Sequence, residues 1–518
     1  MPVREDTVLK IISGENYTPC GLAEKLGARV VLESASYMKG KSRHSLLLID
    51  EAFRLVQKDE EIFIENKNQG GSTVSLPEFR DILDAAGYFS KQHAALEFPF
   101  PAGGIGYLSY EFVKNCDKVK FRNRSAECSG DFVKADAADE KETVKISAAS
   151  GAAETSGAAE TSGAAETSGA AETSGAEILS EIPDASLLFG HVFLIYDHYT
   201  DLIYLLGINY KEAVIDLAAR IAGIEKRIKD LDFNYLVERD EKYECTVVYN
   251  PPAQEFMDNV VLIKEEIKKG NLLQCVVSRK LGIRTEMPPF RAYKKLKSAS
   301  PSSYMFFLDF TDFQLFGSSP EVHLLVNEDK ATMRPIAGTR RRGRDQEEDS
   351  ALERELLEDE KEGCEHLMLV DLARNDLGRV CSAGSVKVSE SRTIERYSHV
   401  MHIVSQVEGE LGGGVTGADA LRATFPAGTV SGAPKLKAIE IIDRLEREKR
   451  GFYAGIVGYF EPGGNLNSCI NIRSGMMAGD ILTLQSGAGI VADSVPEREY
   501  EETCEKMRAI AKVLGLEV

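Results

Sequence analysis

The chain has 518 residues, of which 43% are hydrophobic and 28% charged, and its formal net charge at pH 7 is −20. The acidic balance argues against nucleic acid as a partner, because phosphate binding needs a basic surface. No apolar run reaches the roughly 18 residues that span a bilayer, so no membrane association is expected. The start lacks the apolar region of a signal peptide, and nine cysteines without a CxxC pair indicate reduced thiols in a cytoplasmic protein.

Strand patterns dominate the first half of the chain. After a short helical pattern within residues 1–30, strands are expected at 29–34, 45–50, 61–66, 187–198 and 200–209, a helix at 76–87, and a Pro/Gly-rich turn at 98–111. The last two strands resemble a hairpin. A helix at 212–233 and a charged linker at 234–244 close this half.

Residues 151–174 are four copies of GAAETS, within a small and polar segment at 133–180. Such a composition cannot bury enough apolar surface to fold, so this segment is expected to be a flexible insertion. It interrupts an N-terminal region made of residues 1–132 and 181–233. A catalytic domain is expected at 248–518.

Strands in the second half come in runs joined by short turns, with helices grouped around them. This predicts an α+β fold in which two largely antiparallel sheets pack together with helices outside. The N- and C-terminal regions are expected to form one large interleaved core.

Two pairs of carboxylates stand out in helical segments. Glu362 and Glu365 lie three residues apart in a long acidic helix expected at 346–376, just before an apolar run. Glu499 and Glu502 repeat this spacing near the C-terminus, with Lys506 four residues further on. Each pair lies on one helical face, where burial costs several kcal/mol or more without compensation. Four oxygen donors could hold Mg²⁺, and exposed, salt-bridged helices are the alternative.

A second group of residues could bind an anion. Arg473 lies in an otherwise apolar strand, where a guanidinium needs an anionic ligand or a buried ion pair. Gly487 and Gly489 end another strand, and their amides could cradle an anionic group, although a structural bulge is the usual explanation. Tyr453 could add a hydroxyl donor.

Glu321 and His402 are candidates for proton transfer. Glu321 follows a turn, where a partly buried carboxyl group with a raised pKa could act as a general acid. A lone glutamate in such a position is more often a surface residue, which is the alternative. His402 lies on a strand, where a satisfied core histidine is the alternative.

Taken together, these segments resemble the chorismate-utilising enzymes, and among them most closely the large subunits (component I) of anthranilate synthases. The resemblance covers about residues 250–510, in the family's order. It is carried by FGSSPE (316–321), PIAGTRRRG (335–343), EHLMLVDLARNDLGR (365–379), SHVMHIVS (398–405), FPAGTVSGAPK (425–435), Tyr453 with Gly455 and Gly458, NIRSG (471–475) and QSGAGIVADSVPE (485–497). VLES (31–34) and GGIGYLSYE (103–111) extend it thinly into the N-terminal half.

The resemblance implies roles for these residues. Glu365 and Glu502 would ligate Mg²⁺, with Glu362 and Glu499 beside them through waters, and the metal would hold the ring carboxylate of chorismate. Substrate binding is implied for Tyr453, Arg473, Gly487, Gly489, Lys506 and Gly338. Glu321 would protonate the leaving C4 hydroxyl while ammonia attacks C2. His402 would assist the later loss of pyruvate, and Thr339 would contact the ring.

Two positions bear on which reaction the chain catalyses. Relatives that add water to C2 carry a lysine base where this chain has Gln274, so an amine nucleophile fits better. Aminodeoxychorismate synthases commonly carry a nucleophilic lysine where this chain has Ala337. Both residues indicate anthranilate as the product. Aminodeoxychorismate synthase is the nearest alternative, followed by an isochorismate or salicylate synthase and by a non-catalytic tryptophan-sensing subunit.

The resemblance also implies partners. No cysteine lies in a Gly-x-Cys-x-Gly elbow, so ammonia would come from a separate glutamine amidotransferase in a hetero-oligomer. Tryptophan would inhibit through a pocket formed by an N-terminal segment and an NPSPYM-like segment. Here that pocket would contain Leu32, Glu33, Ser34, Pro301, Tyr304 and Met305. Ser300 and Ser303 replace the usual Asn and Pro, and losing a proline loosens the loop.

Overall fold

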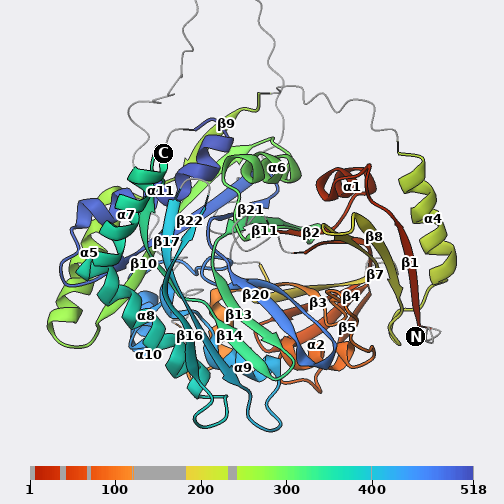
Figure 1. Cartoon of the computed structure of the whole chain (residues 1–518), viewed down its shortest axis with the longest axis horizontal. Coiled ribbons are helices and arrows are strands. Elements are labelled where there is room, and N and C mark those ends of the chain that lie inside the picture. The colour runs from red at the N-terminus through yellow and green to blue at the C-terminus, as the bar shows by residue number, and fades with distance from the viewer. Residues whose placement is uncertain are drawn as a thin grey trace, which may run out of the picture.

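The structure, a computed structural model, describes residues 6–34, 43–66, 72–119, 121, 182–231, 242–397 and 400–516 (Figure 1). The expected insertion at 133–180 and most of the expected linker at 234–244 lie outside the described residues.

The 22 strands of the described part belong to one antiparallel hydrogen-bonded network that folds into two sheets. The long strands β3 and β7 pair along their whole length and belong to both sheets, because register shifts between residues 48 and 53 of β3 bend the pair. The α+β prediction of two packed antiparallel sheets is therefore confirmed.

The first sheet runs in the order β1 (Thr7–Ser13), β8 (Leu202–Ile208), β7 (Ala185–Asp197), β3 (His44–Lys58), β2 (Val30–Glu33), β11 (Tyr304–Asp309), β12 (Gln314–Ser319), β21 (Ser474–Ala478), β22 (Ile481–Ile490), β10 (Gln274–Thr285) and β9 (Cys245–Tyr249). In addition, β18 (Gly432–Ala433) pairs with the start of β10. Strands of the N-terminal region form one half of this sheet and strands of the C-terminal region form the other, and the two halves meet where β2 pairs with β11.

The second sheet runs in the order β5 (Ser72–Ser75), β4 (Glu61–Asn66), β3, β7, β6 (Ile105–Leu108), β19 (Ile456–Phe460), β20 (Leu466–Ile470), β13 (Val322–Asn327), β14 (Lys330–Met333), β17 (Val400–Glu410) and β16 (Lys387–Arg396). On the same side of β17 as β14, β15 (Ile336–Arg341) pairs with the first residues of β17. The two chain regions thus share both sheets, which is the interleaving that the sequence predicts.

The chain crosses between the sheets at two places that matter for the site. β12 lies in the first sheet and β13 in the second, and Glu321 lies between them. β20 lies in the second sheet and β21 in the first, and the connection contains Arg473. The two connections are adjacent, because the Ile470 amide donates to the Glu321 carbonyl oxygen over 3.0 Å.

Hydrophobic side chains on the two faces of the strands form two separate buried clusters. In β3, Leu46 and Leu48 join the large cluster between the sheets, whereas Leu47 and Ile49 face the other way and join a second cluster. Successive side chains of a strand point to opposite faces, so one strand supplies both cores. Helices α1, α4, α6 and α11 cover the second cluster (Figure 1).

The helices lie outside the sheets. They are α1 (Pro19–Leu26), α2 (Ile82–Ser90), α4 (Leu217–Lys229), α5 (Ala253–Lys268), α6 (Pro289–Ala299), α7 (Gln346–Glu358), α8 (Glu360–Gly378), α9 (Gly417–Thr424), α10 (Lys435–Leu445) and α11 (Pro496–Val513). The long acidic helix expected at 346–376 is two helices. Asp359 has extended backbone angles and its side chain caps α8 by accepting from the Glu362 amide, so the chain turns there.

Other local predictions were also wrong. A strand, β1, precedes the helix within the first 30 residues, and the segment after residue 50 continues β3 as a strand. The helix expected at 76–87 is α2, which begins six residues later because Asp81 caps it by accepting from the Leu83 and Asp84 amides.

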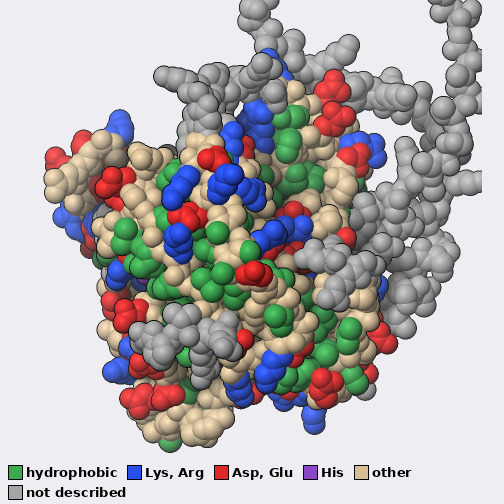
Figure 2. Space-filling view, turned by 90° about the vertical axis from the view of Figure 1, so that its right-hand side faces the viewer, with side chains coloured by type: hydrophobic (Ala, Val, Ile, Leu, Met, Phe, Trp, Pro, Cys, Tyr) green, Lys and Arg blue, Asp and Glu red, His purple; other side chains and the backbone are tan. Residues whose placement is uncertain are grey.

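Figure 2 faces the side of the molecule that carries α4 and β1, where acidic and basic side chains lie interspersed. An example is the ion pair between Lys10 of β1 and Glu225 of α4. In the described part of the chain, no helix combines the length and apolarity needed to cross a membrane.

A buried ion pair joins the two chain regions. Arg422 of α9 donates to both carboxylate oxygens of Asp81, over 2.6 and 2.8 Å. Replacing Arg422 by leucine is expected to lower the free energy of unfolding by about 3–5 kcal/mol, because it leaves a buried carboxylate uncompensated. Denaturant unfolding measures this. Arg80→Gln, which changes an exposed arginine beside the same aspartate, should stay within about 0.5 kcal/mol; equal effects would contradict the assignment.

Candidate active site

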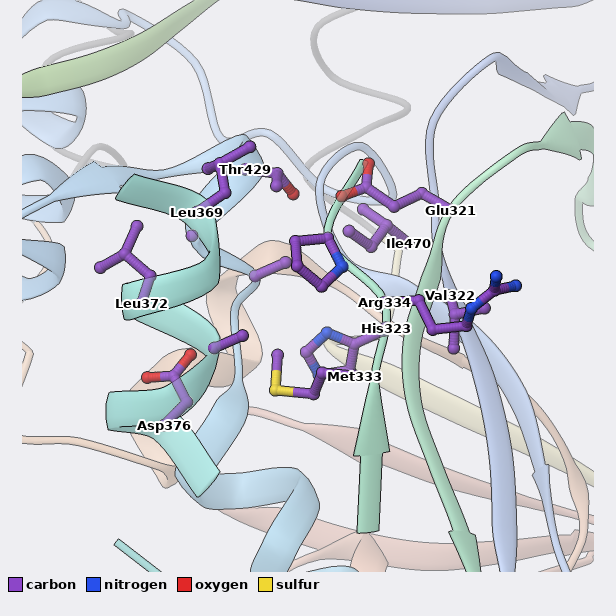
Figure 3. A pocket seen from close by; sticks show the side chains of 14 residues that line it. Glu321, Val322, His323, Met333, Arg334, Leu369, Leu372, Asp376, Thr429 and Ile470 are labelled. Carbon is purple, nitrogen blue, oxygen red and sulfur yellow. The ribbon is translucent and has the colours of Figure 1, made fainter. Parts of the chain in front are cut away.

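Glu321 lies in a pocket at the crossing of the two sheets (Figure 3). The pocket has a volume of about 330 Å³, and α8 supplies Leu369, Leu372 and Asp376 to its wall. Thr429 and His323 also line it. The Glu321 carboxyl group is therefore enclosed by apolar and polar groups from the C-terminal region of the chain, and its exposed fraction is 8%.

Burial controls the protonation of Glu321. Desolvation raises its pKa from 4.5 to about 7, and the interactions with Thr429, Arg473 and Lys506 offset only part of this effect. A carboxyl group with this pKa carries its proton for part of the time at neutral pH. It can therefore donate a proton to a leaving oxygen, as a general acid must.

Arg473 is a half-buried cation near this carboxyl group. Its backbone is left-handed, with φ of 50°, and its carbonyl oxygen accepts from the Ser318 amide over 3.1 Å. Burial lowers its pKa. Among the described residues, its guanidinium makes neither an ion pair nor a hydrogen bond. The alternative of a structural buried pair is thus not seen, and the planar donor group is available for an anion.

The predicted residues of β22 meet Tyr453 and Lys506. A Cβ at Gly487 would lie 2.8 Å from the Tyr453 hydroxyl oxygen, so the phenol packs directly over the glycine backbone. Lys506 of α11 donates to the Gly487 carbonyl oxygen over 2.8 Å. Burial raises the pKa of Tyr453, which keeps the phenol protonated as a donor.

Gln274 lies beside Gly489 on the same face of this sheet. A Cβ at Gly489 would lie 2.6 Å from Gln274 Nε2, so any other residue would displace the amide. The amide is buried, and its Oε1 has no hydrogen-bond partner in the described part of the chain. An unpaired buried acceptor is costly, which makes it a candidate ligand for a donor from outside the protein.

A bulge around Gly338 orients His402. Thr339 is paired with His402 in the β15–β17 ladder, and the register shifts between Ala337 and Thr339 because Gly338 is left-handed, with φ of 66°. His402 Nδ1 lies 2.9 Å from the Gly338 carbonyl oxygen and 3.1 Å from Thr339 Oγ1. A carbonyl oxygen only accepts, so Nδ1 carries the proton and Nε2 has the free lone pair. Burial lowers the His402 pKa to about 4, so the ring is neutral at pH 7.

The four predicted metal ligands face one another across α8 and α11. Desolvation raises the pKa of Glu365, and repulsion from Glu362, Glu502 and Glu499 adds to it. Burial likewise raises the pKa of Glu362 and Glu499. The four carboxylates, which we call the acidic cradle, therefore lie close enough to repel one another.

The chemistry of this cradle fits a hard divalent cation, because four carboxylates that repel one another gain from a shared positive charge. Within the described residues, no three acidic, histidine or cysteine side chains converge closely enough to hold an ion by themselves. The cradle is thus open, and it suits a metal that completes its shell with water and substrate oxygens.

The predicted tryptophan residues also come together, away from the cradle. Met305 pairs with Glu33 between β11 and β2, and Leu32, Ser34, Pro301 and Tyr304 belong to or flank these two strands. Glu33 accepts from the Tyr293 hydroxyl and from Lys297, each over 2.7 Å, and Tyr304 donates to Asn467 Oδ1 over 3.0 Å. Sequence reasoning missed Tyr293 and Lys297.

Thr429 and Asn471 are further residues that sequence reasoning missed in the crossing. Both polar atoms of the Asn471 side chain are buried and have no hydrogen-bond partner among the described residues. The Thr429 hydroxyl interacts with the Glu321 carboxyl group. Both residues lie in motifs that carried the resemblance, FPAGTVSGAPK and NIRSG, so motif membership could have indicated them.

Comparison with known proteins identifies the family. The family described as chorismate binding enzyme matches residues 134–512. A protein from Spirochaeta aurantia named anthranilate synthase component 1 is 51% identical over 517 residues, covering 99% of this chain and 96% of that protein. The chain belongs to the chorismate binding enzymes. The resemblance inferred from the motifs is therefore confirmed.

Other chorismate binding enzymes support the same placement. A Bacillus pumilus protein with the same name is 32% identical and covers 98% of this chain and 92% of its own length. The crystal structure of anthranilate synthase component I from Streptococcus pneumoniae superimposes with a TM-score of 0.71 at 28% identity, over 97% of this chain and 99% of that one. The menaquinone-specific isochorismate synthase of Escherichia coli, at 16% identity, shares the fold with a TM-score of 0.66 over 99% and 96% of the two chains.

Proposed function

We propose that the chain is the large subunit of an anthranilate synthase, a lyase that converts chorismate and ammonia into anthranilate, pyruvate and water. The observation that carries the proposal is that a protonatable buried acid, Glu321, lies near a half-buried guanidinium without an ion-pair partner in the described residues, Arg473, at one crossing of the sheets. Chorismate offers a hydroxyl leaving group and two carboxylates, which match these two groups.

Substrate carboxylates are held from the β22 side. Arg473 supplies a forked donor, and Tyr453 and Lys506 supply single donors beside the Gly487 and Gly489 backbone. The carbonyl oxygen of Gly338 is engaged by His402, so its bulge shapes the pocket next to the ring, where Thr339 lies. This set fixes the ring between the acid and the nucleophile.

The first step replaces the C4 hydroxyl by an amine at C2. Ammonia forms the C–N bond at C2 while the ring double bond shifts and the C4–O bond breaks. Glu321 gives its proton to the departing oxygen, which leaves as water. The unpaired Oε1 of Gln274 accepts from the incoming ammonia and orients it. With Gln274 in place of a lysine, water has no base there.

The second step forms the aromatic ring. The C2 hydrogen leaves as a proton, the C3–O bond to the enolpyruvyl group breaks, and pyruvate departs. His402 is neutral and its Nε2 lone pair is free, so it accepts the proton or orients the base that does.

Replacing His402 by asparagine is expected to slow this second step by about 10²–10⁴-fold, the usual contribution of a proton-transfer group. The asparagine amide can still donate to the Gly338 carbonyl oxygen, so the pocket is preserved. Chorismate consumption should continue, and an aminated intermediate that keeps its enolpyruvyl group should accumulate in chromatography with mass detection. A parallel fall of chorismate consumption and anthranilate formation would contradict this role.

Glu362, Glu365, Glu499 and Glu502 would hold Mg²⁺. Mg²⁺ would supply positive charge against the ring carboxylate of chorismate. Ammonia would come from a glutamine amidotransferase subunit, since the sequence has no nucleophile elbow of that type. Tryptophan would act as inhibitor at the β2–β11 strands, where its ammonium group would compete with Lys297 for Glu33.

The assay follows from these roles. The purified chain, incubated with chorismate, Mg²⁺ and an ammonium salt but no glutamine, should develop anthranilate fluorescence, and reactions lacking either Mg²⁺ or ammonium should not. Failure to form anthranilate at any pH between 6 and 9 (about the range where ammonia and Glu321 are both usable) would overturn the proposal.

A further inference from the structure

Three of the four carboxylates in the acidic cradle have a basic partner. Lys506 Nζ lies 2.8 Å from a Glu502 oxygen, Arg340 lies 3.5 Å from Glu362, and Lys361 Nζ lies 3.8 Å from Glu365. These cations offset much of the negative charge that the carboxylates would otherwise concentrate between α8 and α11.

Two of these cations are anchored elsewhere. Arg340 donates to Glu355 and Asp359, over 2.8 Å each, and Lys506 donates to the Gly487 carbonyl oxygen. Lys361 differs from both. Within the described residues its ammonium group has Glu365 as its ion-pair partner and no hydrogen bond, and its side chain is 64% exposed. It is therefore free to leave the cradle at little cost.

The positive charge of Lys361 acts on carboxylates of both α8 and α11. Lys361 lies one turn before Glu365 on α8 and acts electrostatically on Glu362, Glu365 and, across the interface, Glu499 of α11. It is also in the first turn of α8, where the helix dipole disfavours a cation. Helix stability therefore does not explain this lysine, whereas the carboxylates beside it do.

We infer that Lys361 is a displaceable counter-cation of the acidic cradle, which neutralises the carboxylates when no divalent ion is bound and moves out when one binds. The inference rests on the proposed Mg²⁺ site. It follows that Lys361 weakens Mg²⁺ binding to the free protein. Chorismate brings two further negative charges, so substrate should restore the affinity, and metal loading becomes coupled to substrate binding.

The test is Mg²⁺ binding to the full-length free protein, measured by isothermal titration calorimetry, with Mn²⁺ and electron paramagnetic resonance as a second probe. Lys361→Met should bind Mg²⁺ about fivefold to tenfold more tightly than wild type, the effect of one unit charge on a divalent ion in a water-like dielectric. Adding chorismate should strengthen Mg²⁺ binding more in wild type than in this variant.

Two variants serve as controls. Lys361→Arg keeps the charge and should bind Mg²⁺ like wild type. Arg374→Gln removes a positive charge from the same helix, where it pairs with Asp371, and should change the affinity less than twofold (about the noise of such titrations). If wild type binds Mg²⁺ measurably and Lys361→Met binds it with the same affinity, the inference about Lys361 is overturned but the proposed metal site is not. Absence of binding in every variant would overturn the metal site and this inference together.

Discussion

Replacing Glu321 by glutamine is expected to lower kcat for anthranilate formation by about 10²–10⁴-fold, because the glutamine amide cannot give a proton to the leaving C4 oxygen. Glutamine has nearly the same shape, so the pocket between α8 and the sheet crossing should persist. The chain should therefore still bind chorismate, which equilibrium binding in the absence of ammonia measures.

The pKa of Glu321 adds a pH signature. The acid is active when protonated, so kcat/KM of the wild type should fall as pH rises through about 7. The free energy of unfolding should also fall as pH rises. The unfolded carboxyl group titrates near 4.5 and the folded one near 7, so the folded state holds the extra proton between these values. The free energy of unfolding should thus decrease as pH rises from about 4.5 to 7.

Glu461→Gln is the matched control for Glu321→Gln. Glu461 is also a largely buried carboxyl group with a pKa raised by burial, and its Oε1 accepts from the Phe100 amide, as a glutamine oxygen could. Near-normal turnover is expected in this control. Loss of a general acid should leave at most about a hundredth of wild-type kcat. If Glu321→Gln kept more than about a tenth, the assignment of Glu321 as the general acid would be wrong.

Replacing Arg473 by methionine should have opposite effects on function and stability. Losing the donor to a substrate carboxylate should cost about 2–5 kcal/mol of binding, or at least a 30-fold fall in kcat/KM. The free energy of unfolding should stay the same or rise, because the variant replaces a half-buried charge that has no ion-pair partner in the described residues with an apolar side chain of similar length.

Steady-state kinetics and denaturant unfolding measure both effects on one preparation. The control is Arg447→Gln, since Arg447 is exposed and pairs with Glu255 outside the crossing; both quantities should be nearly unchanged. A large loss of stability in Arg473→Met would instead indicate a structural ion pair.

Much of the site could be predicted from local patterns. The spacing of Glu362 and Glu365, and of Glu499 and Glu502, places each pair on a helical face, and the structure brings the two faces together. Arg473 was singled out as a guanidinium within an apolar strand, and this placement was wrong, because Arg473 lies in the connection between β20 and β21 with a left-handed backbone. The placement of each glutamate pair on one helix could be predicted because helical periodicity is a local property.

What could not be predicted depends on contacts between distant segments. The crossing of the sheets places Glu321 beside Arg473, although about 150 residues separate them. The bulge at Gly338 sets the protonation of His402 through a carbonyl oxygen of another strand. Asp359 ends one helix and caps the next, which acidic composition alone could not distinguish from one long helix. The influence of Lys361 of α8 on Glu499 of α11 depends on how the fold places these two helices, which lie far apart in the sequence.

The most direct measurement is mass spectrometry of the products formed from chorismate, Mg²⁺ and ¹⁵N-labelled ammonium. The expected result is anthranilate carrying the label, with pyruvate released in equal amount. An unlabelled product formed without ammonium, or a labelled product that keeps its enolpyruvyl group as the final species, would contradict the proposed function.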